Sequence, residues 1–334
     1  MDRIYVQTND ESGNEVVAFD RAADGSLTRL GHFETGGRGS GIPHLASQSS
    51  LALDGDRLLV TNAGSDELSL LRVTADGLEL LARTASGGKA PTSVAVHGEL
   101  AYVLNNGTPG IAGFSLADGS LVPLEDSTRA LSAGADPAQI AFSPDGHTLV
   151  VTERGTNSIS TFLVDETGLA AGPETIASSG ATPYGFGFAR DTLVVTEAFG
   201  GEIGAAAASS YSLSEGGMQP LSASVGNSRS EVCWAAVTKD GRFVFVANFG
   251  DCTISRYSIG DDGRIELAEP VAASTRRDEK GLRDEAITGD GRFLYALDAD
   301  ARRIFGWSLG EDGSLSPVGE ADALPETVAG LAAS

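Results

Sequence analysis

The sequence is poor in the residues that build disulfide frameworks and metal centres. Its 334 residues include two cysteines, Cys233 and Cys252, and four histidines that are scattered along the chain. Two cysteines are too few for a disulfide framework, and no C-x-x-C pair or Cys/His cluster with zinc-ligand spacing occurs. We therefore expect no metal and no bound cofactor, and we do not expect a site made of histidines.

Long apolar runs and basic residues are also scarce. No stretch of about 18 consecutive apolar residues is present, so no membrane-spanning helix is predicted. The formal net charge of −23 would repel the phosphates of nucleic acids and the surface of anionic lipids. Neither a nucleic acid nor a membrane is therefore expected as a partner. The opening MDRIYVQTND has no apolar signal-peptide core, which predicts a cytoplasmic protein.

A sequence motif recurs along the whole length of the chain. EVCWAAVTKDGRFVFVANFGD (231–251) and AFSPDGHTLVVTERG (141–155) each run from an apolar segment through an Asp-Gly turn into a second apolar segment that ends on a polar residue. The corresponding polar residues lie 43 to 54 residues apart and form what we call the polar column: Thr8, Asn62, Asn105, Glu153, Glu197, Asn248 and Asp298. Such periods are typical of β-propellers, because each four-stranded sheet has two apolar faces that its neighbours must cover.

The seven members of the polar column predict seven blades, and the chain ends predict how the ring closes. The segment 4–8 has the pattern of a second strand, whereas PETVAGLAAS (325–334) matches the first-strand pattern PTSVAV (91–96). We expect residues 327–332 to form the innermost strand beside residues 5–8, so that no sheet edge stays open. The predicted fold class is all-β, a seven-bladed propeller of four-stranded antiparallel sheets in a single domain over residues 1–334.

The loops of the predicted ring differ between its two faces. Turns between first and second strands, such as SPDGH and TKDGR, are short and similar, and we assign them to the bottom face. Connections on the opposite, top face are long and dissimilar, as in GGRGSGIPHLASQ (36–48) and STRRDEKGLRDE (274–285). Long irregular loops on a rigid scaffold commonly carry function. The functional site is therefore expected at the top mouth of the ring.

Two sets of residues are predicted to surround this mouth. One is the polar column. The other is the set of residues that open the first strands, namely Ser50, Ser93, Gln139, Gly185, Trp234, Asp284 and Thr327. These positions differ from blade to blade, so they are candidates for binding a ligand.

Glu153 and Glu197 are the predicted catalytic residues. They occupy equivalent positions in adjacent blades, so their carboxylates could approach each other or share a ligand. Crowded carboxylates in a partly dry mouth raise one pKa, which suits general acid/base catalysis. The alternative is structural: an acid at the end of a strand accepts hydrogen bonds from the next loop, as we expect of the asparagines in this column.

Arginines and aromatic residues supply further candidates. Six arginines fall in top loops, where their planar donors suit an anionic substrate or an oxyanion: Arg38, Arg154, Arg229, Arg276, Arg277 and Arg283. The alternative is ion pairing with local acids. Tyr184 and Trp234 could form the wall of a pocket, or they could pack in the core. Cys233 has no aligned histidine and is interpreted as a buried thiol, and His44 as a free loop residue. The predicted substrate-binding residues are Arg38, Gln139, Arg154, Tyr184, Trp234, Asn248, Arg283 and Asp284.

The phrases SPDGHTLVVTERGTNSI, LVVTEAFGG and EVCWAAVTKDGRFVFVANFG resemble the seven-bladed lactonase family, which includes 6-phosphogluconolactonase-type and 3-carboxymuconate-cyclase-type propellers. The resemblance covers essentially the whole chain. Members of that family carry Pro-Arg-His at the start of a first strand and a Glu at the end of the next strand. Here the corresponding residues are Pro137, Ala138 and Gln139, while Glu153 retains the acid. The resemblance therefore implies a functional role for Glu153 alone.

Three functions agree with these observations. The first is hydrolysis or formation of a small anionic lactone by carboxylate general acid/base catalysis. The second is a cyclase, isomerase or lyase reaction on a carboxylated ring substrate. The third is a non-catalytic propeller that binds a ligand or a protein through its top loops. For both enzyme hypotheses the expected partner is a small anionic molecule, and the sequence does not indicate its identity or the oligomeric state.

Overall fold

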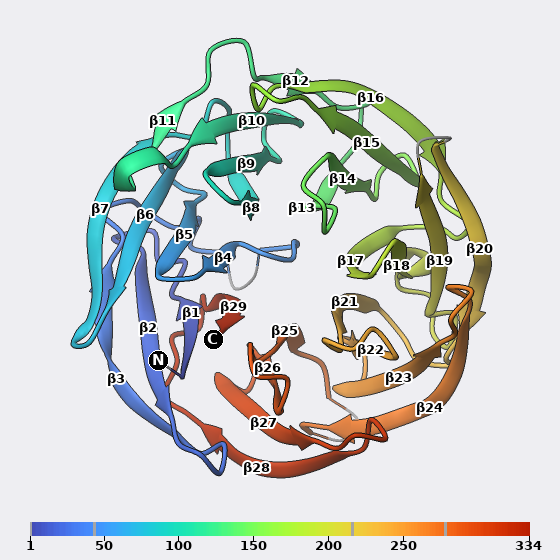
Figure 1. Ribbon diagram of the computed structural model, residues 1–334. Helices are drawn as coiled ribbons and strands as arrows, with labels where there is room; N and C mark the ends of the chain where they lie inside the picture. Colours follow the sequence, from blue (N-terminus) through green and yellow to red (C-terminus); the bar gives the residue numbers. More distant parts are fainter. Residues whose placement is uncertain (1, 43–44, 215–216, 277–278) are drawn as a thin grey trace.

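The computed structural model describes residues 2–334 except 43–44, 215–216 and 277–278. The described strands form seven antiparallel sheets arranged around one axis (Figure 1). The predicted seven-bladed propeller is therefore confirmed. Among the described residues, no helix is both long and apolar enough to cross a membrane.

Each blade is built from strands that follow one another outwards from the axis. Blade 1 contains β29 (Ala329–Ala333), β1 (Arg3–Gln7), β2 (Glu15–Arg21) and β3 (Leu27–Glu34). Blade 2 contains β4 (Leu51–Asp54), β5 (Arg57–Asn62), β6 (Glu67–Thr74) and β7 (Gly77–Ala85). Blade 3 contains β8 (Pro91–His97), β9 (Leu100–Asn105), β10 (Gly110–Ser115) and two short outer segments, β11 (Val122–Pro123) and β12 (Arg129–Ala130).

The remaining four blades are regular four-stranded sheets. Blade 4 contains β13 (Pro137–Phe142), β14 (Thr148–Glu153), β15 (Ser158–Val164) and β16 (Ala170–Ala177). Blade 5 contains β17 (Pro183–Ala189), β18 (Thr192–Glu197), β19 (Ala207–Ser214) and β20 (Gly217–Gly226). Blade 6 contains β21 (Val232–Val237), β22 (Phe243–Asn248), β23 (Thr253–Ile259) and β24 (Ile265–Ser274). Blade 7 contains β25 (Leu282–Ile287), β26 (Phe293–Asp298), β27 (Arg303–Leu309) and β28 (Leu315–Ala321).

The core lies between the blades, because alternate side chains of a strand point to opposite faces of its sheet. In β5, Leu58 and Val60 pack in a cluster shared with blade 1, whereas Leu59 packs in a cluster shared with blade 3. Each sheet is thus covered on both faces by its neighbours, as the repeat predicts. The outer position of blade 3 departs from the rule. It is split into β11 and β12, and Pro123 in β11 lacks the N–H that a continuous ladder requires.

The chain ends close the ring within blade 1. β29 pairs with β1 in the register Ile4↔Ala333, Tyr5↔Ala332 and Val6↔Leu331, and the two strands lie side by side in Figure 1. The predicted closure is confirmed, but the strand begins at Ala329 rather than at Thr327. Residues 325–328 form a turn instead, in which the N–H of Val328 bonds to the carbonyl of Pro325. The prediction that Thr327 opens this strand is therefore wrong, and Gly330 with a φ of 69° takes the bulged position.

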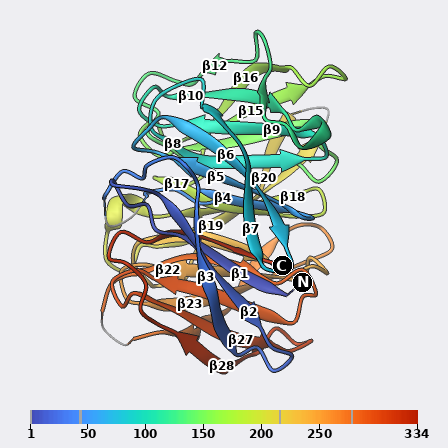
Figure 2. The same cartoon turned by 90° about the vertical axis from the view of Figure 1, so that its left-hand side faces the viewer.

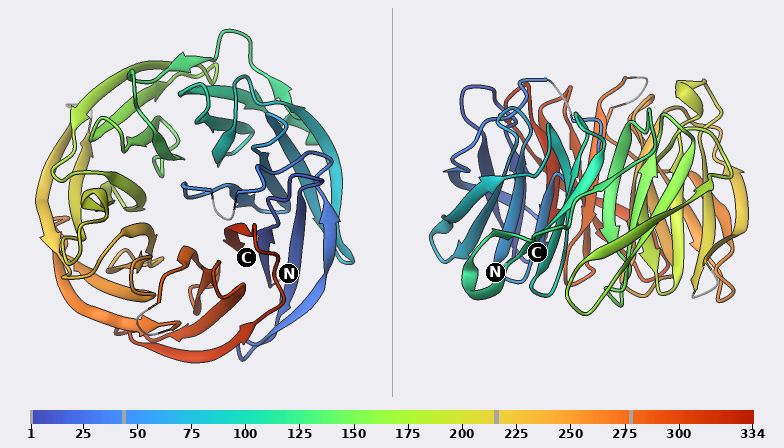
Figure 3. Two further views of the ribbon diagram at one scale, coloured as in Figure 1. Left: turned by 180° about the vertical axis from the view of Figure 1, so that it is seen from behind. Right: turned by 90° about the horizontal axis from the view of Figure 1, so that it is seen from above.

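The two faces of the ring differ as predicted. The terminal residues lie together at one face, where the N–H of Ser334 bonds to the carbonyl of Arg3 (Figure 2). The long connections between blades emerge on the opposite face, at the upper side of the right-hand view in Figure 3. One of them, the connection from β3 to β4, extends into the middle of the ring (Figure 1).

Candidate functional site

The polar column lies at the top of the ring, as predicted. Six of its members are the last residues of second strands, namely Asn62, Asn105, Glu153, Glu197, Asn248 and Asp298. Thr8 directly follows β1. All seven side chains are buried, so their polar atoms need partners inside the protein.

Repeated hydrogen bonds make this column part of the scaffold. In four blades the column residue bonds to a serine on the third strand, in the pairs Asn62–Ser69 (2.8 Å), Glu153–Ser160 (2.6 Å), Glu197–Ser209 (2.6 Å) and Asn248–Ser255 (2.9 Å). At five blade junctions it bonds to the residue that directly follows the outer strand of the preceding blade, in the pairs Thr35–Asn62, Ser86–Asn105, Ser178–Glu197, Asn227–Asn248 and Thr275–Asp298. The column therefore joins each of these blades to its neighbour.

The two predicted catalytic acids follow this scheme. Glu153 accepts hydrogen bonds from the hydroxyls of Ser160 (2.6 Å) and Thr156 (2.9 Å). Glu197 accepts from three close donors, which are Ser209 Oγ, Ser224 Oγ and the N–H of Gly180. Both carboxylates have no exposed surface, and no hydrogen bond joins them in the part of the chain that the structure describes. These contacts favour the structural alternative, and a catalytic role for either acid stays a prediction.

Three of the residues predicted to open the first strands, Ser93, Gln139 and Asp284, act as braces between blades. The innermost strand of each blade has an edge that faces the channel, where its N–H groups have no further strand to pair with. Ser93 Oγ accepts the N–H of Ile140 in the next blade at 3.1 Å, and Gln139 Oε1 accepts that of Phe186 at 2.7 Å. Gln139 Nε2 also donates to the carbonyl of Phe186. Gln139 was predicted to bind substrate, but both polar atoms of its side chain form hydrogen bonds within the scaffold.

Asp284 braces blade 7 to blade 1. Its Oδ1 accepts the N–H of Glu285 and its Oδ2 accepts that of Leu331, both at 3.0 Å. Burial nevertheless raises the pKa of Asp284 to about 7. Burial and the charge of Asp284 also raise the pKa of Glu285, whose carboxyl oxygens have no hydrogen bond of good geometry, although the N–H of Ala247 lies nearby. Both acceptors of Asp284, another predicted substrate-binding residue, are therefore used within the channel wall.

The arginines of the top loops differ in their surroundings. Arg229 and Arg276 form ion pairs with nearby aspartates at 3.6 Å and 2.8 Å. Arg38 is exposed and makes no side-chain hydrogen bond or ion pair with any described residue. Arg277 and His44 lie outside the described residues. Arg38, Arg229 and Arg276 therefore give no evidence of a shared site among the described residues.

Arg154 and Tyr184 form a connected pair at the mouth. Arg154 Nη1 donates to Tyr184 Oη at 2.9 Å, and the guanidinium carbon lies 4.7 Å from the centre of the tyrosine ring. A second nitrogen of Arg154 bonds to Asp136 at 2.7 Å. Because Tyr184 Oη accepts from Arg154, its own hydrogen can be donated to another acceptor. Burial raises the pKa of Tyr184 well above the usual range, so the phenol stays protonated.

Arg283 is a buried cation that forms no ion pair with any described residue. It is 6% exposed, and its side chain makes no hydrogen bond or ion pair in the part of the chain that the structure describes. Its Nε is fully buried and unpartnered, while the guanidinium carbon lies 4.3 Å from the centre of the Phe249 ring. Burial lowers the pKa of Arg283, and the more distant Asp300 offsets this in part. The cost of removing this cation from water is therefore offset by no hydrogen bond or ion pair from its side chain to a described residue.

Arg154, Tyr184, Cys233, Phe249 and Arg283 together form what we call the arginine site. Tyr184 and Cys233 both lie within electrostatic range of the two arginines. Burial raises the pKa of Cys233 to about 12, so its thiol stays neutral, and it donates to the carbonyl of Glu231 at 3.3 Å. The interpretation of Cys233 as a buried thiol agrees with this environment.

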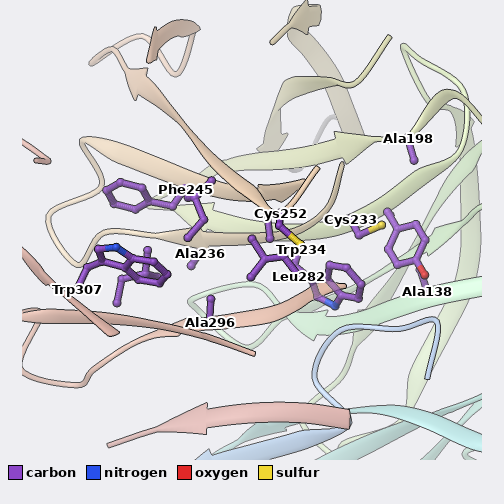
Figure 4. Close-up of a cluster of buried hydrophobic side chains, with 14 residues drawn as sticks. Ala138, Ala198, Cys233, Trp234, Ala236, Phe245, Cys252, Leu282, Ala296 and Trp307 are labelled. Atoms are coloured by element: carbon purple, nitrogen blue, oxygen red, sulfur yellow. The ribbon is translucent and has the colours of Figure 1, made fainter. Parts of the chain in front are cut away.

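Trp234 supports the arginine site from the core. It is 1% exposed, its ring centre lies 5.6 Å from that of Tyr184, and its Nε1 donates to the carbonyl of Ser47. Figure 4 shows Trp234 and Cys233 within a buried cluster that also contains Cys252 and Leu282. Of the two interpretations of Trp234, core packing accounts for its position.

Three residues of this region were not expected from the sequence. The Phe249 ring packs against the guanidinium of Arg283. Ser47 and Gln48 form hydrogen bonds with residues of blade 6, on the other side of the channel. Gly185 is the signal that could have revealed Gln48, because a glycine inside a strand often marks the close approach of another group.

A hollow outside the mouth offers a weaker alternative site. A cavity of about 430 Å³ lies on the bottom face between blades 6 and 7, where Asp240 and Arg242 form part of its lining. These two residues bind each other at 2.6 Å, and Lys239 donates to a carbonyl. Asp240 and Arg242 thus neutralise each other's charge. In the described part of the chain, no three His, Cys, Asp or Glu side chains are placed to hold a metal ion.

Comparison with known proteins places this geometry in a family. No curated protein of similar sequence is found. The fold is similar to that of a Lactobacillus plantarum protein (17% identity, TM-score 0.78, covering 100% of this chain and 99% of the other). It is also similar to the periplasmic gluconolactonase PpgL of Pseudomonas aeruginosa (18% identity, TM-score 0.75, 99% and 98%). The family model described as "Lactonase, 7-bladed beta-propeller" matches residues 54–198 and 193–329. Since these matches cover most of the chain, the protein belongs to the seven-bladed β-propeller lactonase family.

Proposed function

We propose that this protein hydrolyses a small lactone that carries an anionic group, and that it binds this substrate at the arginine site. The observation that carries the proposal is the buried guanidinium of Arg283 at the top mouth, whose Nε has no hydrogen-bond partner among the described residues. Family membership supports the reaction class. The strongly acidic chain repels anions at long range, so binding an anionic substrate requires a cation in direct contact with it.

Arg283 is the proposed anchor for the anionic group. A carboxylate or phosphate oxygen bound to its free N–H donors would form charge-assisted hydrogen bonds and would compensate the desolvation of the cation. The Phe249 ring on one side restricts the orientation of the guanidinium plane. Arg283 therefore fixes the position of the substrate without taking part in bond cleavage.

Tyr184 is the proposed electrophilic group. Attack of water on the lactone carbonyl gives a tetrahedral intermediate whose negative charge lies on the former carbonyl oxygen. The phenolic hydrogen of Tyr184 can be donated to that oxygen, and the bond from Arg154 to Tyr184 Oη strengthens this donation. Collapse of the intermediate breaks the bond between the carbonyl carbon and the ring oxygen, which takes a proton to give the open hydroxy acid. Lactone formation is the reverse of these steps.

Glu153 is the proposed proton-transfer residue, as the family resemblance implies. It precedes Arg154 directly, and its contact with Thr156 Oγ1 is its bond nearest the top loop. Proton transfer by Glu153 requires a water to replace this hydroxyl, while Ser160 keeps its bond to the other oxygen. Glu197 accepts hydrogen bonds from more donors than Glu153 does. We therefore assign Glu197 to the scaffold and not to substrate binding.

Two pairs of variants test these assignments. Arg283→Met should raise the KM for carboxylated five- and six-membered lactones about 10- to 100-fold, with a smaller effect on neutral lactones. Arg303→Gln in the same blade removes a half-buried, ion-paired arginine and is the charge-matched control. Equal KM values for Arg283→Met and wild type would refute the anchor.

The second pair separates catalysis from scaffold. Glu153→Gln should lower kcat about 10²- to 10⁴-fold if Glu153 transfers protons, whereas Glu197→Gln should mainly lower the melting temperature. Hydrolysis is followed as proton release at constant pH. Wild-type turnover by Glu153→Gln would leave Glu153 with a structural role, and failure of wild type to open any lactone would refute the proposed function.

A further inference from the structure

One position in the ring of braces lacks a side chain. In blades 3, 4 and 7 the brace is provided by Ser93, Gln139 and Asp284, which each bond to the N–H of the residue 47 positions further along the chain. The corresponding residue of blade 5 is Gly185, which has no side chain to bond to Ala235 in blade 6. The N–H of Ala235 therefore needs an acceptor from another part of the chain.

Gln48 provides that acceptor from the loop between β3 and β4. Its Oε1 accepts the N–H of Ala235 at 3.1 Å, and its Nε2 donates to the carbonyl of the same residue at 2.9 Å. A Cβ atom added to Gly185 would lie 2.2 Å from this Oε1, so the glutamine occupies the space that the glycine leaves. A residue from the junction of blades 1 and 2 thus completes the brace between blades 5 and 6.

The neighbours of Gln48 extend this link across the channel. We call residues 45–50 the plug segment. The N–H of Gln48 donates to the carbonyl of Ala138 in blade 4, and Ser47 Oγ donates to the carbonyl of Thr92 in blade 3. The carbonyl of Ser47 accepts from Trp234 Nε1 at 3.2 Å. The plug segment therefore bonds to the inner strands of blades 3, 4 and 6, and one of these bonds orients Trp234.

We propose that Gln48 is a positioning residue for the arginine site: by anchoring the plug segment to Ala235 it fixes Trp234, and through Trp234 the ring of Tyr184. This inference rests on the proposed function of the arginine site. Trp234 has a single N–H donor, and Ser47 is its partner. Its ring centre lies 5.6 Å from that of Tyr184, whose hydroxyl is the proposed electrophile. A small rotation of the indole would therefore shift the donor that faces the substrate.

The plug segment also restricts where a substrate can bind. Because it crosses the channel at the level of the braces, a ligand at the mouth is held above it and beside blades 4 to 7. The hydrogen bond of Ser93 joins two neighbouring blades, and the Ser93 side chain makes no hydrogen bond to residues 45–50, all of which the structure describes. Ser93→Ala therefore serves as the matched control for loss of a brace.

The test uses tryptophan emission as well as turnover. The chain has two tryptophans, so a Trp307→Phe parent isolates the emission of Trp234. In this parent, Gln48→Ala should shift the emission to longer wavelength, increase its quenching by acrylamide, and lower kcat/KM for an accepted lactone about tenfold. Gln48→Glu retains an acceptor for the N–H of Ala235 but places a second oxygen against the Ala235 carbonyl, so it should shift the emission in the same direction as Gln48→Ala. Ser93→Ala should leave emission and kcat/KM unchanged.

The outcomes separate this inference from the proposed function. Unchanged emission and quenching in Gln48→Ala would overturn the positioning role, whatever the activity. If Ser93→Ala and Gln48→Ala have equal melting temperatures and lose the same kcat/KM, Gln48 only joins blades and has no special effect on the arginine site. That result would also overturn the positioning role. If wild type opens no lactone, the proposed function fails, while the emission of Gln48→Ala still decides whether Gln48 fixes Trp234.

Discussion

Replacement of Asp284 by asparagine should change how stability depends on pH. The folded protein holds this carboxyl at a pKa of about 7 because it is buried, whereas an unfolded chain holds it near about 3.9. A carboxyl whose pKa is raised by folding stabilises the fold while it is protonated. This contribution is fully present below about pH 4 and is lost as the pH rises through 7.

The expected magnitude follows from that difference in pKa. Between pH 5 and pH 8 the wild type should lose about 3 kcal/mol of unfolding free energy through Asp284. Asp284→Asn cannot ionise, so it should lack this loss. Its single acceptor oxygen leaves one of the two backbone N–H groups poorly bonded, at a cost of about 1 to 3 kcal/mol at every pH. The advantage of wild type over the variant should therefore shrink by about 3 kcal/mol from pH 5 to pH 8.

Urea unfolding of both proteins at pH 5, 6, 7 and 8 measures this difference directly. Asp240→Asn is the control, because hydrogen bonds from Thr238 and Arg242 outweigh desolvation and lower the pKa of Asp240 to about 2. Both its folded and unfolded pKa values lie below this range, so its effect on stability should be constant from pH 5 to pH 8. A constant offset between wild type and Asp284→Asn would refute the titration of Asp284 in the channel.

Two further predictions concern closure and the thiol. Deletion of residues 325–334 removes β29 and exposes the inner edge of β1. The truncated protein should therefore aggregate or melt at a much lower temperature, as measured by light scattering and thermal unfolding. A soluble truncated protein with an unchanged melting midpoint would contradict the role of β29 in closure. Cys233→Ser should retain most of any lactonase activity, because burial raises the pKa of this thiol to about 12 and keeps it un-ionised; loss of turnover with an unchanged melting temperature would instead make Cys233 part of the reaction.

The fold could be predicted because its determinants are local and repeated. An Asp-Gly turn between two short apolar segments specifies a hairpin, and seven such units have no other way to cover both faces of each sheet. Prediction was less accurate where local signals change. Pro123 interrupts the outer strand of blade 3, and the turn at residues 325–328 delays β29 by two residues.

The candidate site was harder to predict, because a buried polar residue at a strand end fits both a catalytic and a structural role. A signal for the structural role was present, since Ser69, Ser160 and Ser255 each follow a column residue by seven positions. Burial and hydrogen bonds decide such cases, and these depend on residues distant in sequence. Likewise, the sequence shows six arginines in top loops but not which of them lacks a partner. Arg276 pairs with Asp298, whereas Arg283 forms no ion pair with any residue in the described part of the chain.

The arginine site is adjacent in sequence to the scaffold residues. Arg154 and Phe249 each follow a member of the polar column, while Tyr184, Cys233 and Arg283 each precede a residue that opens a first strand. The column and the braces use their polar atoms to join blades, so they have few left for a ligand. Neighbouring residues in extended backbone point in different directions, which frees the adjacent side chains to face the mouth. If this division holds, alanine at 154, 184, 249 or 283 should reduce turnover more than stability. Alanine at 139 or 284 should do the reverse, and an equal loss of both properties at all six positions would refute it.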